Sequence, residues 1–146
     1  MVLELSSKCD YCLSALIELA DLYSSGQPLQ IRQIAKRQNI PERYLEQLLL
    51  LLKRGGLVRS QRGMNGGYSL ARDPQSISIL EVIQCIDGTD NARHPEDCAE
   101  RTPESKTVRT VWGRACDAAE DILESCTLKD LINKRNESYQ SQMYYI

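Results

Sequence analysis

The sequence predicts a mainly helical protein with one small β-hairpin. Three observations support this prediction. Apolar residues recur at helical spacing in several segments, a glycine-rich turn (GMNGG, 63–67) separates two short strand-like runs, and a 22-residue stretch (104–125) keeps a helical apolar stripe. With 146 residues, the chain forms one domain, or one domain with an appended arm, and can bury a real core.

Three helices are predicted in the first third of the chain. Ser6 or Ser7 can cap a helix from about 8 to 23, and a short amphipathic helix follows over 31–38 (IRQIAKRQ). Pro41 suits the first helical position of a third helix, PERYLEQLLLLLKRGG (41–56), which ends at a glycine pair.

The hairpin follows directly. LVRSQRG (57–63) and GGYSLAR (66–72) are predicted strands, and tight reversal between them needs glycines because it demands positive φ. Helix, helix, turn, helix and hairpin is the order of a winged helix-turn-helix head, which we expect over 1–75. Basic residues occur where such a wing would touch DNA: Arg59, Arg62 and Arg72.

The region 76–135 is predicted to hold a linker helix, a loop and a long dimerisation helix. Ser78 and Glu81 have capping-box spacing ahead of the linker helix, and the polar loop at 89–105 is long enough to be functional or disordered. The helix over 104–125 would span roughly 33 Å, more than a small head can cover, so its apolar stripe is expected to pack on a second copy. A short final helix (127–134) and a polar C-terminal tail (136–146) complete the chain.

Charge is segregated along the chain, although the net charge is only −2. Residues 29–72 contain nine Lys and Arg but only two Glu. From residue 76 to the end there are eight basic and thirteen acidic residues. This asymmetry favours a polyanion partner for the head, and the alternative is a solvated basic face without a partner.

Several classes of protein are disfavoured. No signal peptide and no apolar run of membrane-spanning length occurs, so a soluble cytoplasmic protein with mostly reduced cysteines is expected. The sequence has no HExxH, GxSxG, P-loop or paired CxxC motif, and the pair Cys9 and Cys12 lacks the preceding strand of a thioredoxin-like site. We therefore expect no enzyme.

Several segments together resemble the IscR/CymR-like family of winged-helix regulators, which includes iron–sulfur and nitric-oxide sensors and a cysteine-metabolism repressor. The similar segments are SKCDYCLSALIELA, YLEQLLLLLKRGGLVRSQRGMNGGYSL, ILEVIQCIDG and TLKDL, which together reach over nearly the whole chain. The resemblance implies a homodimeric regulator, a repressor in our interpretation, that binds a near-palindromic operator in double-stranded DNA.

The resemblance also implies roles for individual residues. Glu46 on the recognition helix would tune discrimination between bases, because a carboxylate accepts from cytosine and repels unmatched acceptors. The ring of Tyr44 could instead pack in the core. The expected DNA-binding residues are Arg32, Lys36, Arg43, Tyr44, Glu46, Gln47, Arg59, Arg62, Gly66 and Gly67.

The sensed signal stays open between two hypotheses. Cluster-binding relatives carry three close cysteines in the loop, whereas this loop offers only His94 and Cys98. Other ligand sets in the family use a carboxylate on the first helix, which Asp10 matches, so an iron–sulfur cluster could be held by Asp10 of one chain and His94 and Cys98 of its partner. Cys85 and Cys116 are further possible donors. The alternative is that Asp10 is an exposed helical residue, His94 an ordinary loop histidine and Cys98 a free thiol.

The second hypothesis is a cluster-free repressor of cysteine metabolism. Its relative in the family also ends in aromatic residues and Ile, as MYYI (143–146) does here. The resemblance implies that Tyr145 and Ile146 could bind cysteine synthase, with the terminal carboxylate entering the enzyme's active site. The alternative is that this end packs back on the dimer. In both hypotheses Cys9 and Cys12 lie on the apolar stripe of the first helix and are interpreted mainly as core residues.

Overall fold

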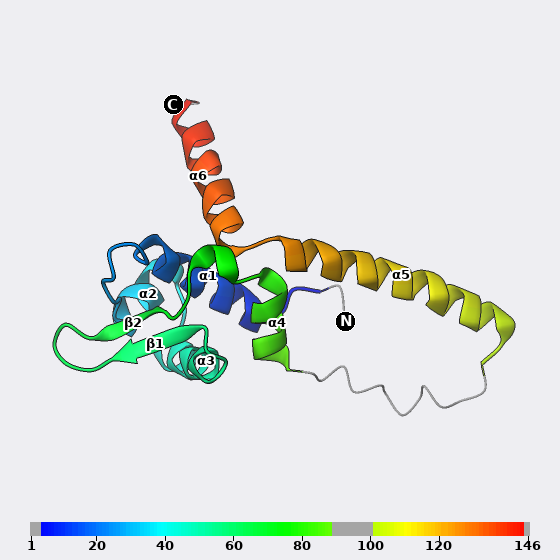
Figure 1. Cartoon of the computed structure of the whole chain (residues 1–146), viewed down its shortest axis with the longest axis horizontal. Coiled ribbons are helices and arrows are strands. Elements are labelled where there is room, and N and C mark those ends of the chain that lie inside the picture. The colour runs from blue at the N-terminus through cyan, green and yellow to red at the C-terminus, as the bar shows by residue number, and fades with distance from the viewer. Residues whose placement is uncertain (1–3, 89–100, 145–146) are drawn as a thin grey trace.

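A computed structural model gives the structure of the protein and describes residues 4–88 and 101–144. Figure 1 shows a head of helices and a hairpin, from which two C-terminal helices project in different directions. The elements are α1 (Ser7–Asp21), α2 (Ile31–Gln38), α3 (Glu42–Arg54), β1 (Val58–Gln61), β2 (Gly67–Leu70), the 3-10 turn η1 (Pro74–Ser76), α4 (Ile79–Asp87), α5 (Pro103–Ser125) and α6 (Leu128–Tyr144).

The first helix begins at a serine cap, as predicted. The Ser6 hydroxyl accepts a hydrogen bond from the Cys9 amide at 3.1 Å, which satisfies one of the unpaired amides of the first turn. The helix buries one stripe of its surface, including both cysteines. Tyr23, which we expected on this stripe, lies beyond the end of the helix and is 36% exposed.

The turn between α2 and α3 is made by Asn39, which adopts the left-handed conformation with φ 54° and closes α2. Pro41 is the N-cap of α3 and not its first helical residue. Four leucines, spaced at helical intervals, then fix α3 to the core: Leu45, Leu48, Leu49 and Leu52.

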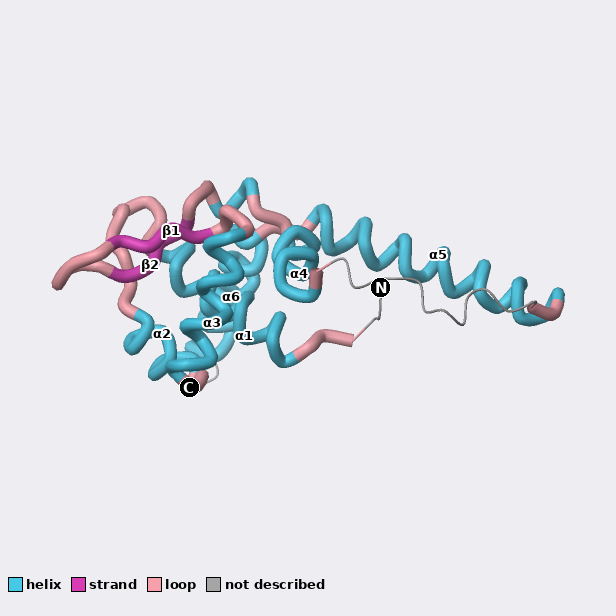
Figure 2. The backbone as a smooth tube through the Cα atoms, turned by 90° about the horizontal axis from the view of Figure 1, so that it is seen from below, coloured by secondary structure: helices cyan, strands magenta, loops and turns pink. Residues whose placement is uncertain are grey.

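The hairpin is a two-stranded antiparallel sheet in which Val58 faces Leu70 and Gln61 faces Gly67. It is tied to the helices by a third segment, because Leu29 and Tyr68 exchange backbone hydrogen bonds of 2.8 and 2.7 Å. Figure 2 shows the hairpin at the end of the head opposite to α5. The wing is thus anchored to the residues that precede α2.

The fourth helix starts with only half of the predicted capping box. The Ser78 hydroxyl accepts from the Glu81 amide at 3.1 Å, but the Glu81 carboxylate pairs with Arg72 at 2.6 Å. A charged partner within reach forms a stronger hydrogen bond than a neutral backbone amide does. This contact joins the end of the hairpin to α4.

The long helix α5 leaves the head as predicted and buries none of its residues within the single chain. Its apolar side chains remain exposed, with Val108 at 68%, Trp112 at 59% and Ile122 at 67%. An apolar stripe of this length in water is unfavourable unless a partner covers it.

The last helix is longer than predicted. We expected a short helix over 127–134 followed by a polar tail, but α6 continues to Tyr144. Only Leu128 and Ile132 are buried, so the apolar pattern that reveals a helix stops early. The extension is supported by Arg135, whose guanidinium donates twice to Asp21 at 2.7 Å.

A short backbone pairing joins the projecting helices to the head. The Ile79 amide donates to the Cys126 carbonyl at 2.9 Å, and the Leu128 amide donates to the Ile77 carbonyl at 3.0 Å. Thr127 and Asp130 form the predicted cap at the start of α6. The junction between α5 and α6 is therefore held against the start of α4.

Candidate nucleic-acid interface

The exposed face of α3 is set by the burial of its opposite face. With the four leucines in the core, Arg43, Glu46 and Gln47 point to solvent near the N-terminal end of the helix. This is the part of a recognition helix that reaches base edges in helix-turn-helix proteins.

Tyr44 occupies a different environment from its neighbours. It is half-buried, and its ring meets the ring of Tyr11 on α1 edge to face, with centroids 5.9 Å apart and planes at 82°. This contact agrees with the core-packing interpretation of Tyr44 and links the first helix to α3.

Two basic residues of α2 lie on its exposed side. Arg32 and Lys36 face solvent, whereas the neighbouring Arg37 pairs with Glu18 of α1 at 3.1 Å. Gln30 precedes the helix and forms a capping box with Gln33. Two of the three cations of α2 therefore stay available for a ligand.

The wing carries Arg59 on β1 and Arg62 in the turn, and both are exposed. The glycines of the turn have structural roles. A Cβ on Gly66 would collide with the Gln61 carbonyl, and a Cβ on Gly67, whose φ is 146°, would collide with the Leu29 carbonyl. Gly66 is buried and shapes the backbone of the wing, and its role in DNA binding stays a prediction.

Arg72 differs from the sequence-based expectation. We grouped it with the basic residues of the wing, but its guanidinium lies 2.6 Å from the Glu81 carboxylate and 3.4 Å from the Ser76 carbonyl oxygen. Its charge is partly neutralised within the chain. Sequence periodicity gave no signal for this pair, because the two residues lie on different elements.

The residues considered as cluster ligands are not brought together among the described residues. Asp10 is exposed on α1 and accepts a hydrogen bond from the Ser14 hydroxyl at 3.4 Å. Within residues 4–88 and 101–144, no three His, Cys, Asp or Glu side chains group closely enough to hold a metal ion. Among these residues of a single chain, Asp10 therefore has no neighbouring pair of donors with which to form a metal site. His94, Cys98, Tyr145 and Ile146 lie outside the described residues.

The CxxC pair belongs to the core. Cys9 is 1% exposed and Cys12 is fully buried, and burial raises the pKa of the Cys12 thiol to about 12. Burial also raises the pKa of Cys9, whose thiol donates to Asp87 at 3.3 Å. Burial and an un-ionised thiol agree with the interpretation of both cysteines as core residues.

Cys85 of α4 lies against the end of α3, and burial raises the pKa of its thiol. Its thiol contacts the Leu51 carbonyl at 3.6 Å and occupies the space where a side chain on Gly55 would lie. Cys116 is half-buried on α5. The five described cysteines are free thiols in this structure.

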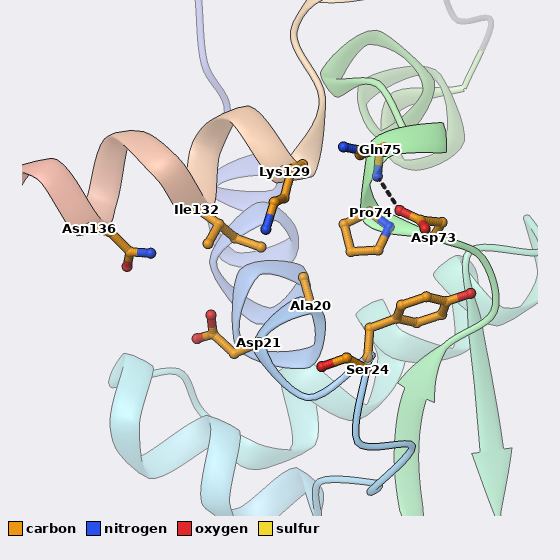
Figure 3. Close-up of a pocket in the computed structure, with 10 residues that line it drawn as sticks. Ala20, Asp21, Ser24, Asp73, Pro74, Gln75, Lys129, Ile132 and Asn136 are labelled. Atoms are coloured by element: carbon orange, nitrogen blue, oxygen red, sulfur yellow. Dashed lines mark hydrogen bonds between the residues drawn. The ribbon is translucent and has the colours of Figure 1, made fainter.

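A pocket lies between the surface of the head and the first turns of α6. Figure 3 shows its walls, which come from the end of α1, from η1 and from the start of α6. It has a volume of about 480 Å³ and a buried apolar floor of Ala20, Pro74 and Ile132. None of its lining residues belongs to α2, α3 or the two strands, so it lies outside the candidate interface.

The fold and this surface define a class of protein. A recognition helix with an exposed polar face, followed by a basic hairpin anchored to the residues that precede α2, is the arrangement of a winged helix-turn-helix DNA-binding protein. The Rrf2 family, described as iron-dependent transcriptional regulators, matches residues 5–134. The chain belongs to this family and is a transcriptional regulator, not an enzyme.

Named relatives agree with this assignment. The transcriptional regulator CymR of Bacillus subtilis is 35% identical over 144 residues, which cover 99% of this chain and all of the relative. Among solved structures, IscR of T. potens has a TM-score of 0.77 at 33% identity and covers 93% of this chain and 90% of its own. The structure of CymR, the global cysteine regulator of B. subtilis, has a TM-score of 0.76 at 35% identity, with 91% and 98% covered.

No described helix is both long and apolar enough to cross a membrane.

Proposed function

We propose that the protein is a homodimeric repressor that binds a near-palindromic operator through α3 and the wing. The observation that carries this proposal is the grouping of exposed cations on three neighbouring elements of the head. They are Arg32 and Lys36 on α2, Arg43 on α3, and Arg59 and Arg62 on the wing. Such cations position a protein on phosphates, and the exposed polar face of α3 supplies contacts to bases.

Arg62 provides the test of DNA binding. Arg62→Ala is expected to weaken binding to an operator selected from random duplexes and to reduce the slope of log K against log salt by about one contact. Lys134→Ala on α6 removes the same charge far along the chain and serves as the control. Binding of Arg62→Ala that matches the wild type at every salt concentration would contradict the assignment of the wing.

The dimer part of the proposal rests on α5. Its first half carries Lys106, Arg109 and Arg114 against Glu104, and its second half carries only acids: Asp117, Glu120, Asp121 and Glu124. Two copies that pack their apolar stripes in antiparallel orientation would oppose the basic half of one helix to the acidic half of the other. A parallel pair would oppose like charges.

Trp112 tests this interface. Trp112→Glu puts a charge into the exposed apolar stripe and is expected to convert dimers into monomers in light scattering. Thr110→Glu adds the same charge on the opposite side of the helix, where Thr110 bonds to the Lys106 carbonyl, and should leave the dimer intact. A dimer that persists in Trp112→Glu would exclude α5 as the interface.

For the signal, we propose iron–sulfur or redox status, with a cluster held by Asp10 of one chain and His94 and Cys98 of the partner. The exposed carboxylate of Asp10 on α1, which is accessible to a partner chain, supports this proposal. Imidazole and thiolate ligands suit such a cluster chemically. Absorption spectra and iron and sulfide analysis of protein purified without oxygen test the proposal, and Asp10→Ala should lose the iron.

The second candidate is a cluster-free repressor of cysteine metabolism that binds cysteine synthase through Tyr145 and Ile146. Two observations favour it: the similarity to CymR extends over both whole chains, and α6 ends with exposed Met143 (77%) and Tyr144 (90%). Iron-free protein with full affinity for DNA would support this candidate over the first. Removal of residues 143–146 should then abolish a complex with cysteine synthase, and a complex of unchanged affinity would exclude the tail.

A further inference from the structure

The most exposed large apolar side chain among the described residues lies at the tip of the wing. Met64 is 95% exposed, and it follows Arg62 by two residues in the turn between β1 and β2. The next residue, Asn65, is also exposed and uncharged. The tip of this basic hairpin therefore carries no charged side chain, and the thioether of Met64 has no donor to offer a phosphate oxygen.

The backbone of the tip is held in place. The Gly66 amide donates to the Gly63 carbonyl at 3.0 Å and closes the turn, in which Gly63 has a φ of 108°. The side chain of Gln30, at the start of α2, donates to the Met64 carbonyl at 3.5 Å. The Met64 side chain thus projects into solvent from a turn that is anchored to the helix-turn-helix.

We infer that Met64 is a specificity-determining residue that enters the minor groove of the operator and contacts the sugar and base edges there. This inference rests on the proposed function, since it requires the wing to lie on DNA. Apolar side chains, Met among them, serve as wedges at minor-groove steps, and the unbranched thioether adapts to an irregular surface. Steps that unstack easily, such as TA and CA, would be preferred opposite the wing.

Loss of the Met64 contact and loss of Arg62 should change the salt dependence of DNA binding in different ways. Burying an apolar side chain releases no counterions, so its loss weakens binding equally at every salt concentration. Loss of Arg62, in contrast, should lower both the affinity and the slope of log K against log salt. Because Met64 would prefer a deformable step, its replacement should weaken binding to the operator more than binding to random DNA.

The experiment compares Met64→Gln, which keeps the length but adds an amide, with Met64→Leu, which keeps the apolar character. The probe is an operator selected from random duplexes, with 2-aminopurine at the step that hydroxyl-radical footprinting assigns to the wing. We expect Met64→Gln to lose about three- to tenfold in affinity with an unchanged salt slope, and to lose the fluorescence increase that reports unstacking. Met64→Leu should retain both.

The outcomes separate this inference from the proposed function. If Met64→Gln binds like the wild type while Arg62→Ala weakens binding, the inferred groove contact is overturned. The proposed contact between the wing and DNA would still hold. If neither variant changes binding, the proposed role of the wing fails as well. A loss of equal size on operator and on random duplexes would overturn the specificity role.

Discussion

Tyr11 of α1 and Tyr44 of α3 meet edge to face, with ring centroids 5.9 Å apart. Tyr11 directly follows Asp10, the residue proposed as a cluster ligand, and Tyr44 lies between Arg43 and Leu45 on α3. The aromatic pair therefore connects the candidate sensing residue with the recognition helix through one side-chain contact. A shift of α1 at Asp10 would therefore also change the position of a ring that packs against α3.

The aromatic pair should be energetically coupled. We expect Tyr11→Ala and Tyr44→Ala each to lower the free energy of unfolding, and a double-mutant cycle to give a coupling of about 0.5–1.5 kcal/mol. Tyr44→Phe keeps the ring and should cost little. Denaturant unfolding measures the cycle, and additive effects of the two substitutions would show that the rings do not stabilise each other.

Gly67 should be sensitive to substitution. Gly67→Ala combines a φ of 146° with a collision against the Leu29 carbonyl, so we expect a loss of at least about 2 kcal/mol and a weakened wing. Gly26→Ala is the matched control, because Gly26 has a φ of 69° but open space around its Cα, and should cost about 1 kcal/mol. Thermal unfolding of both variants checks the difference. Equal losses would mean that the contact with Leu29 does not matter.

The contact between α3 and α4 allows a compensation test. Gly55 has an ordinary φ of −77°, so the cost of Gly55→Ala comes from the Cys85 thiol, which lies where the new methyl group must go. We expect a loss of about 1–3 kcal/mol for Gly55→Ala and recovery of most of it in the double variant with Cys85→Ala, where the methyl group fills the vacated space. A double variant no more stable than Gly55→Ala alone would refute this explanation.

Cys12 should make stability depend on alkaline pH. Its pKa is raised from about 9 to about 12, so the unfolded chain loses this proton first as the pH rises. The stabilising contribution is complete below pH 9 and is lost progressively toward pH 12, at up to about 1.4 kcal/mol per pH unit.

Cys12→Ala supplies the comparison for this prediction. The unfolding free energy of the wild type should fall more steeply than that of Cys12→Ala above pH 9, because Cys9, Cys85 and the other titrating groups are common to both. Iodoacetamide should also label Cys12 slowly in the folded protein at pH 8 and rapidly in denaturant. Parallel pH profiles would contradict the burial of an un-ionised thiol.

Elements with a repeating apolar pattern were predictable from the sequence, and contacts between distant residues were not. The helices α1, α2, α3 and α5 and the glycine-marked hairpin were confirmed as elements, with ends shifted by a few residues. The length of α6 was missed because its second half has no apolar stripe and depends on the ion pair of Arg135 with Asp21. The pairing of Arg72 with Glu81 and the ring contact of Tyr44 likewise required the folded arrangement.

In the candidate interface, too, positions on a periodic helix were predictable and positions in a turn were not. Exposure of Arg43, Glu46 and Gln47 could be expected once the leucines of α3 were assigned to the core. The exposure of Met64 could not, since a methionine in a glycine-rich turn carries no periodic signal. The turn sequence GMNGG contained it, but only the anchoring by Gln30 shows that the tip is held.

The backbone pairing at the junction of α5 and α6 has a geometric consequence for the proposed dimer. With 23 residues, α5 is about 35 Å long, and its C-terminal end is held where Cys126 and Leu128 bond to the residues that begin α4. A rotation of about 10° at this junction would displace the far end by roughly 6 Å, nearly two base-pair steps of DNA. Substitutions at Cys126 or Thr127, which touch neither bases nor phosphates, would thus retune the distance between the two heads and with it the phasing of the half-sites that the dimer can bind.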